Sequence, residues 1–401
     1  MGKKKNKTRK IGKINPVLYH VAHAVVWLMY RKYHITMDKE AVKGLKGPAI
    51  VVATHTCDED HLLSGMTLYP VRPTYIVSEH FMRNKSTAPL MKLMHVITKK
   101  MFTPDISTIM NVMRAKKENA VIVIFPEGRL SCYGHSLPVT EGTAELVKKL
   151  GVPLYAWKAE GAYLTFPKWR DKGDSRPGKI NASIRLLLSA EEVAATDVCE
   201  IKRITEEAIR HDDELAMAGV EYRSDAMARG VDRILYKCPL CLGEGKISAE
   251  GDKIRCECGM EATLDNTYRL HGVRFDRVNE WFEWQQAEIT PEAEHLASAV
   301  KLGCPGEDGY MDENAGEGHA YIDAHEFRLK GQLYGEPIEF TVRTDRIGAF
   351  PITPGRHFDI YHEGRLIYVY PQPDERMTVK WVAYLDRLSE LRRALPAGKE
   401  E

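Results

Sequence analysis

The chain has 401 residues, more than most single hydrophobic cores accommodate, so two or more domains are expected. With 44% hydrophobic and 28% charged residues, wholesale disorder and a fibrous repeat are excluded. No apolar run reaches the roughly 18 residues that a spanning helix needs, which excludes a protein with several membrane spans.

The net charge of +1 conceals an uneven layout along the chain. Residues 1–37 contain nine Lys and Arg and no Asp or Glu, whereas the remainder holds 48 basic and 56 acidic residues. Seven of the nine cations lie in residues 3–13. A basic arm on an acidic body predicts attachment to an anionic surface, and anionic membrane lipids are the partner we expect.

An apolar helix is predicted from about residue 17 to residue 30, between Pro16 and the basic pair at residues 31 and 32. Aliphatic side chains occupy one face, and the other face carries His20, His23, Trp27 and Tyr30. The helix is too short to span a bilayer, and its aromatic face suits a bilayer interface. Residues 1–37 are therefore predicted to be a basic arm with an interfacial membrane helix. A helix packed on the protein's own core and a signal peptide are the alternatives, although no small-residue cleavage site follows.

Residues 38–200 show the alternation of strands and helices that is typical of an α/β fold. Buried strands are predicted at 49–54, 73–78, 120–125, 152–156 and 180–188, and helices at 87–100, 105–119 and 141–150. This order predicts a mostly parallel sheet flanked by helices. The polar segment 201–236 is predicted to be a helical linker.

His55 directly follows the first of these strands, and Asp60 lies five positions later in HTCDED. Open α/β sheets build their sites at the carboxyl ends of strands. A carboxylate at this spacing can reach one ring nitrogen and raise the basicity of the other, so the pair can remove a proton from a hydroxyl. A satisfied structural histidine is the alternative, since the chain contains a second such match at His271 and Asp276, interpreted as incidental.

The segment FPEGRLS, residues 125–131, follows the strand at 120–125 and also projects from a strand end. Gly128 permits a tight turn that presents Glu127 and Arg129 together, and an arginine fork suits a phosphate. Taken alone, this segment is equally compatible with a capped turn between a strand and a helix.

Together and in this order, HTCDED and FPEGRLS resemble blocks of the lysophospholipid acyltransferase family, specifically its 1-acyl-sn-glycerol-3-phosphate acyltransferases. The first block usually reads N-H-x4-D and the third FPEGTRS; GVPL at residues 151–154 resembles the fourth. The second block matches poorly, and HVITKKMF in its place leaves Lys99 and Lys100 as candidate phosphate ligands. The resemblance covers about residues 40–200.

The resemblance implies roles for these residues. His55 is expected to be the general base, oriented by Asp60, while Glu127, Gly128 and Arg129 help to hold the acceptor. The implied reaction transfers an acyl group from acyl-CoA or acyl carrier protein to the free hydroxyl of lysophosphatidic acid, with no catalytic cofactor. Cys57 lies within the first block, but a thiol nucleophile is disfavoured.

Four cysteines lie in two close pairs, and a predicted β-hairpin separates the pairs. Residues 237–265 are thereby predicted to form a zinc ribbon with a structural Zn²⁺ held by four thiolates: Cys238, Cys241, Cys256 and Cys258. The second pair, C-x-C-G, is one residue short of the usual spacing. The segment resembles the ribbon that follows the catalytic domain in some bacterial acyltransferases. Clustered thiols in a long chain also indicate a reducing cytosol.

Residues 266–401 change character, with short strands predicted at 338–343, 357–361 and 365–370 and a final helix at about 378–395. This β-rich module closed by a helix loosely resembles PH- or GRAM-like lipid-binding folds; a β-sandwich or a dimerisation module fits equally well. The complete prediction is a peripheral enzyme on the cytoplasmic face of the cell membrane that binds no nucleic acid. A catalytically inactive lipid-binding scaffold and a zinc-ribbon nucleic-acid-binding protein are the alternatives.

Overall fold

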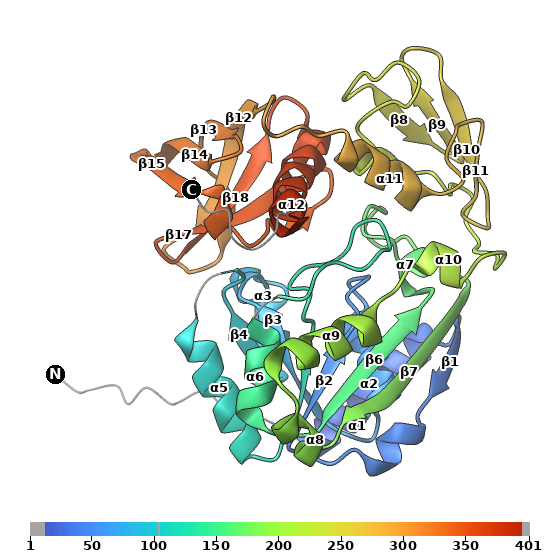
Figure 1. Ribbon diagram of the computed structural model, residues 1–401, viewed down its shortest axis with the longest axis vertical. Coiled ribbons are helices and arrows are strands. Elements are labelled where there is room, and N and C mark those ends of the chain that lie inside the picture. Colours follow the sequence, from blue (N-terminus) through green and yellow to red (C-terminus); the bar gives the residue numbers. More distant parts are fainter. Residues whose placement is uncertain (1–12, 103–104, 141, 395–401) are drawn as a thin grey trace.

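The computed structural model describes residues 13–102, 105–140 and 142–394. Most of the predicted basic arm lies outside the described residues. Figure 1 shows an α/β part below, a small antiparallel sheet at the upper right, and a larger antiparallel sheet with a long helix at the upper left.

The α/β part contains a seven-stranded sheet in the order β1-β7-β6-β2-β5-β3-β4. All neighbours are parallel except β6 and β7. The central strand β2 is buried along its whole length, as expected for a parallel sheet covered on both faces. The predicted fold class is confirmed. The strands are β1 (His34–Asp38), β2 (Ala49–Ala53), β3 (Pro73–Ser78), β4 (Ile97–Lys99), β5 (Val121–Ile124), β6 (Leu154–Glu160) and β7 (Lys179–Leu188).

Ten α-helices are described before the small sheet begins. They are α1 (Pro16–Tyr30), α2 (Asp60–Leu68), α3 (His80–Arg83), α4 (Ala88–Leu93), α5 (Ile106–Lys117), α6 (Gly142–Leu150), α7 (Ala162–Thr165), α8 (Ala190–Ala195), α9 (Val198–Ile209) and α10 (Asp213–Ala216). Short 3-10 turns lie at Glu40–Gly44, Val231–Arg233, Thr344–Arg346 and Glu375–Met377.

Two helix predictions need correction. The helix expected over 87–100 ends at Leu93, because His95 adopts a positive φ of 54° and the chain then re-enters the sheet as β4. In the segment 201–236, helix is confined to α9 and the single turn of α10. Beyond it, Gly219 and Gly230 take positive φ values that an α-helix does not contain.

The orientation of α1 differs from the expectation. Part of its aromatic face packs on the protein: the His23 ring stacks on Tyr69 with centroids 3.7 Å apart, and the neighbouring Tyr19 hydroxyl donates to the Gly65 carbonyl at 3.2 Å. Polar rings on this side of α1 can stack and form hydrogen bonds with residues on and beside α2, whereas aliphatic side chains cannot form such bonds. The exposed side chains are instead Val17, Val21, Val25, Leu28 and Met29, together with Trp27. Within the described residues, no helix combines the length and apolar character needed to cross a bilayer.

The small sheet is antiparallel, in the order β11-β10-β9-β8, and continues to His271. Its strands are β8 (Ile247–Glu250), β9 (Lys253–Cys256), β10 (Glu261–Leu264) and β11 (Leu270–His271), and helix α11 (Val278–Ala287) follows.

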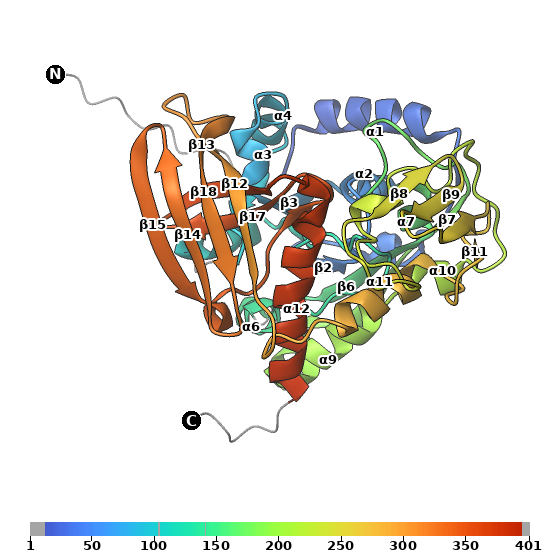
Figure 2. The ribbon, with the colours of Figure 1, turned by 90° about the horizontal axis from the view of Figure 1, so that it is seen from above.

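The C-terminal module, as we call residues 296–394, is a seven-stranded antiparallel sheet closed by helix α12 (Thr378–Ala394). Figure 2 shows α12 running alongside this sheet, between it and the rest of the chain. The buried rings of Phe327, Phe350, Phe358 and Trp381 form its core. The strand order is β15-β14-β13-β12-β18-β17-β16, with β12 (Leu296–Pro305), β13 (Met311–Ile322), β14 (Glu326–Leu333), β15 (Glu336–Arg343), β16 (Ile352–Thr353), β17 (His357–His362) and β18 (Arg365–Pro371).

Candidate active site

The structure brings His55 and Asp60 together at the carboxyl end of β2. His55 Nδ1 lies 3.2 Å from Asp60 Oδ2. Asp60 is fully buried, and the same oxygen accepts the backbone N–H groups of Thr56 at 2.6 Å and Cys57 at 3.0 Å. The two backbone N–H groups hold the Asp60 carboxylate in position, and the carboxylate orients the His55 imidazole. Nε2 of His55 has no hydrogen-bond partner among the described residues and is the nitrogen able to accept a proton.

The buried Cys57 thiol is unsuited to act as a nucleophile. Its Sγ donates to Asp60 Oδ1 at 3.2 Å. Burial, reinforced by the Asp60 charge, raises the pKa of this thiol well above its ordinary value. Because the thiolate is the reactive form, the environment suppresses reactivity at this position.

The FPEGR segment and the histidine motif form one hydrogen-bonded unit. Glu127 is buried; its Oε1 accepts the backbone N–H of His55 at 3.3 Å, and its Oε2 accepts that of Leu137 at 2.9 Å. The Ser131 N–H donates to the His55 carbonyl at 3.1 Å. Phe125 stacks on the imidazole with centroids 4.3 Å apart. Glu127 therefore acts on the position of His55, and burial raises the pKa of its carboxyl to about 8.

Gly128 and Arg129 follow in a constrained turn. Gly128 has φ +75°, and a Cβ there would lie 3.1 Å from both Phe102 and Thr140, so a side chain is disfavoured on two grounds. The Arg129 guanidinium forms an ion pair with Asp386 on α12 and donates to the Phe350 carbonyl at 3.2 Å. The arginine predicted to bind phosphate is thus engaged by the C-terminal module.

The two lysines of the poorly matching block lie in different surroundings. Lys99, the last residue of β4, lines the cavity that contains His55, and burial lowers the pKa of its ammonium group. Lys100 does not line this cavity; its Nζ donates to the Gly364 carbonyl at 3.3 Å. Of the residues predicted to bind the acceptor, Lys99, Gly128 and Arg129 border the cavity, whereas Lys100 and Glu127 do not.

The cavity beside His55, which we call the catalytic cavity for the role proposed below, has a volume of about 990 Å³. Its wall is predominantly apolar, with Val25 from α1, Met91 from α4 and Ile109 from α5 among its lining residues. The remaining wall includes residues of the C-terminal module, namely Pro351, Ile352, Thr353 and Asp359. A large apolar space beside a few polar groups is suited to a ligand with a long hydrocarbon part.

Sequence reasoning missed several polar residues that line the same cavity. Asp58 lies within the HTCDED motif, and its Oδ1 accepts from Lys168 Nζ at 2.7 Å. Lys168 belongs to the FPKW stretch beyond β6, so both signals were present in the sequence. His80 and Asp359 also line the cavity, but their positions depend on contacts between distant segments.

The second H-x4-D match does not form a catalytic pair. His271 Nε2 lies 2.7 Å from Asp265 Oδ2, while Asp276 accepts from Arg269 at 3.1 Å. All of these side chains lie on the exposed surface of the small sheet, in agreement with the incidental interpretation.

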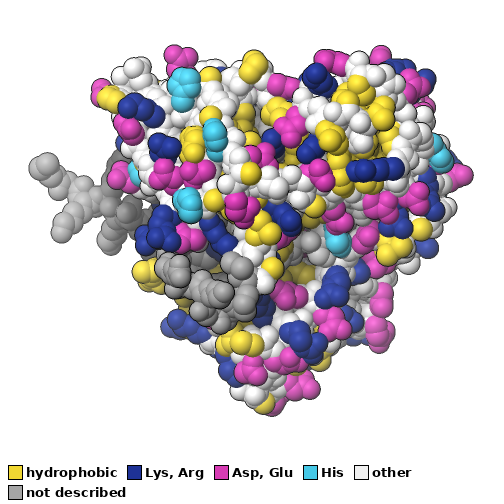
Figure 3. Space-filling view, turned by 45° about the horizontal axis from the view of Figure 1, so that its top comes forward, with side chains coloured by type: hydrophobic (Ala, Val, Ile, Leu, Met, Phe, Trp, Pro, Cys, Tyr) yellow, Lys and Arg dark blue, Asp and Glu magenta, His cyan; other side chains and the backbone are white. Residues whose placement is uncertain are grey.

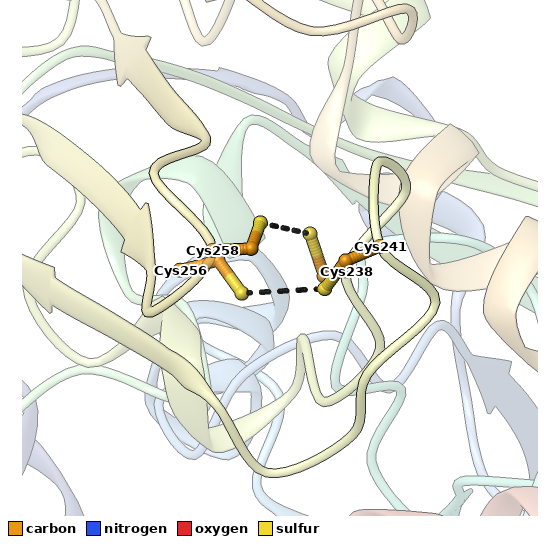
Figure 4. Close-up of side chains that lie close together, drawn as sticks. All are labelled: Cys238, Cys241, Cys256 and Cys258. Carbon is orange, nitrogen blue, oxygen red and sulfur yellow. Dashed lines mark hydrogen bonds between the residues drawn. The ribbon is translucent and has the colours of Figure 1, made fainter.

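The four clustered cysteines meet at one point of the small sheet (Figure 4). Their sulfurs all lie within 4.8 Å of one another, and Cys238–Cys258 and Cys241–Cys256 are each separated by 3.8 Å. Tetrahedral Zn²⁺ with bonds of about 2.3 Å to sulfur places its ligands about 3.8 Å apart, so these residues fit such an ion. The short C-x-C spacing does not prevent convergence. The cluster can hold a metal ion, and all four positions of a tetrahedron are supplied by the protein.

Comparison with known proteins addresses the α/β part. Residues 31–157 match the family model described as Acyltransferase, a stretch that contains both His55-Asp60 and FPEGR. Both motifs therefore lie in a stretch that is similar to acyltransferases, in agreement with the resemblance inferred from the motifs. Among solved structures, a similar protein is the 1-acyl-sn-glycerophosphate (LPA) acyltransferase PlsC from Thermotoga maritima. It has 18% identity and a TM-score of 0.38, over 48% of this chain and 74% of that chain.

Proposed function

We propose that the protein transfers a fatty acyl group from acyl-CoA or acyl carrier protein to the free hydroxyl of a lysophospholipid, with lysophosphatidic acid as the first acceptor to test. The observation that carries this proposal is the His55–Asp60 pair, which opens on a largely apolar cavity within an acyltransferase-family domain. The product from lysophosphatidic acid is phosphatidic acid, a step of phospholipid biosynthesis.

In this mechanism Nε2 of His55 takes the proton of the acceptor hydroxyl, and Asp60 stabilises the resulting imidazolium. The hydroxyl oxygen forms a bond to the thioester carbon. The tetrahedral intermediate places negative charge on the former carbonyl oxygen, which backbone N–H groups near the motif stabilise. When the carbon–sulfur bond breaks, the thiolate leaves and takes the proton from His55. Glu127 keeps the histidine backbone in place, Lys99 lends positive charge to the cavity wall, and Arg129, paired with Asp386, borders the same cavity.

Membrane attachment completes the proposal. The exposed aliphatic stripe of α1 and the basic residues before it are suited to the cytoplasmic face of an anionic membrane, each cation adding about 1 kcal/mol near the surface. Val25 is both exposed and part of the cavity lining, so a lipid at the α1 surface has a short path to the cavity. The protein would then be peripheral and meet its substrates at the bilayer.

The cysteine cluster is proposed to hold a structural Zn²⁺. Four thiolates would complete the metal's tetrahedron, so no position is open for a substrate.

The C-terminal module is proposed to be PH- or GRAM-like, on the basis of its seven-stranded antiparallel sheet and closing helix. On the face in Figure 3, basic and acidic side chains are interspersed and form no continuous basic field, which does not favour the nucleic-acid alternative.

The test is acyl transfer by the purified protein with a panel of lysolipids and both classes of acyl donor. His55→Ala should lower the rate at least about 10²–10⁴-fold, the usual contribution of a positioned base. His271→Ala is the matched control, because it removes the histidine of the second H-x4-D match and should retain activity. Equal rates for wild type and His55→Ala would refute the mechanism. No transfer to any acceptor by wild type would favour a lipid-binding scaffold.

A further inference from the structure

The C-terminal module buries a polar face of its sheet against the acyltransferase domain. On β17 and β18, Phe358 and Val369 point into the module's own core, while His357, Tyr368 and Tyr370 lie on the opposite face. That face is buried as well: Met311 and Lys301 of the module cover part of it, and the Tyr368 hydroxyl bonds His80 of the acyltransferase domain. The two parts are therefore packed through this face.

Asp359 belongs to the same face and lines the catalytic cavity. Its side chain is 10% exposed, and its one described polar contact is with His357 Nε2 at 3.4 Å. Burial lowers the pKa of His357 well below its ordinary value, and burial also raises the pKa of the Asp359 carboxyl to about 8. Asp359 therefore presents a carboxyl group to the cavity without a charged partner in hydrogen-bond contact among the described residues.

The other charged groups that line the cavity indicate which part of a ligand would lie beside Asp359. Asp58 and Lys168 line the same cavity as His55 and Asp359, and the charge of Lys168 lowers the pKa of both Asp58 and Asp359 against the effect of burial. The charge of Lys168 is matched by Asp58 at 2.7 Å, and that of Arg129 by Asp386. This corner of the cavity is thus polar but not strongly cationic. A carboxylate contributes nothing to the binding of phosphate oxygens, which are themselves hydrogen-bond acceptors. Asp359 therefore indicates a ligand that also carries a hydrogen-bond donor.

We propose that Asp359 is a specificity-determining residue that accepts a hydrogen bond from the head group of the acceptor lysophospholipid. This inference rests on the proposed function. The required chemistry is an N–H or O–H donor, which an ammonium, an alcohol or a protonated phosphate oxygen can supply. The C-terminal module then completes the acceptor site, with the catalytic base on one wall and the head-group contact on another.

The experiment compares acceptors that differ in this donor. Lysophosphatidylethanolamine and lysophosphatidylcholine share a phosphodiester and differ in methylation, which replaces every N–H of the head group. We expect wild type to favour the ethanolamine lipid in kcat/KM by about tenfold, the range of a hydrogen bond to a charged group. In Asp359→Leu the ratio should fall to about one. Lysophosphatidylglycerol and lysophosphatidic acid, each compared with the choline lipid in the same way, distinguish alcohol and phosphate donors.

The ratio is measured on a single preparation, so loss of folded protein lowers both rates and leaves their ratio unchanged. Asp312→Leu, at an exposed position on β13 of the same module, is the matched control and should retain the wild-type ratios. The assignment is supported if the kcat/KM of any donor-carrying lipid relative to the choline lipid changes in Asp359→Leu and does not change in Asp312→Leu. If wild type acylates these lipids and Asp359→Leu leaves every ratio unchanged, the assignment is overturned while the proposed function stands. If wild type acylates none of them, both are overturned.

Discussion

The ion pair between Arg129 and Asp386 connects the FPEGR turn to the last helix of the chain, and its removal gives a quantitative test of the packing between the two parts. The side chains are 8% and 21% exposed, and Arg129 also donates to the Phe350 carbonyl. Asp386→Leu would leave the guanidinium buried with one carbonyl partner and no counter-charge. Breaking a buried pair costs about 3–5 kcal/mol, and because Asp386 retains some solvent contact we expect about 3 kcal/mol.

The double variant Arg129→Met with Asp386→Leu separates the lost charge from the lost packing. Replacing both members of a buried pair by apolar groups of similar volume is often neutral or stabilising, so most of the loss should be recovered. The measurement is the free energy of unfolding in urea, from the midpoint and slope of the transition. Asp386→Leu within about 0.5 kcal/mol of wild type, the range of an ordinary surface substitution, would refute the reasoning. So would a double variant as unstable as the single one.

Three further predictions concern other parts of the molecule. Cys258→Ser should lower the zinc content from about one ion per chain and reduce the stability of the protein. Cys199→Ser, at an exposed cysteine outside the cluster, should change neither quantity. Wild-type protein that contains no zinc would contradict the proposed zinc site. Burial raises the pKa of Glu127 from its usual 4.5 to about 8, so the folded state keeps a proton that the unfolded state releases. The stability of wild type relative to Glu127→Gln should therefore fall as pH rises from about 4.5 to 8, and a constant difference contradicts this. Val21→Glu combined with Leu28→Glu should weaken co-sedimentation with anionic vesicles, since both side chains are more than half exposed on α1. Leu215→Glu, at a leucine of α10 that is 57% exposed, is its control. An equal loss of vesicle binding in this control refutes a specific role for α1.

The parts of the fold that the sequence predicted well are those whose pattern is local. The strands β2 and β5 are short, continuous apolar runs that are buried along their whole length, and such runs can be recognised without tertiary information. The pairing of His55 with Asp60 follows from the end of β2 and the first turn of α2. The cysteine cluster could be predicted for the same reason, because a hairpin between two close pairs of cysteines brings the pairs together.

The features that escaped prediction depend on distant partners or on weak patterns. Strand β13 contains glycines and acids, and its inward positions are too few to give an apolar signal. The contact of Arg129 with Asp386 joins residues 257 positions apart, so the motif alone indicated a phosphate ligand where the structure has an ion pair. Asp359 is an ordinary acid in a short strand until the packing of the C-terminal module brings it to the cavity.

The bond between Arg129 and Asp386 has a consequence for how the protein is made. Domains generally fold in the order of their synthesis, and the α/β part is complete in sequence long before α12 is translated. The nascent acyltransferase domain can build its sheet and join His55 to Asp60, yet its FPEGR turn must wait for the C-terminal helix. The FPEGR turn thus reaches its final arrangement only after α12 has been translated, and a chain truncated ahead of α12 would lack the Asp386 partner of Arg129.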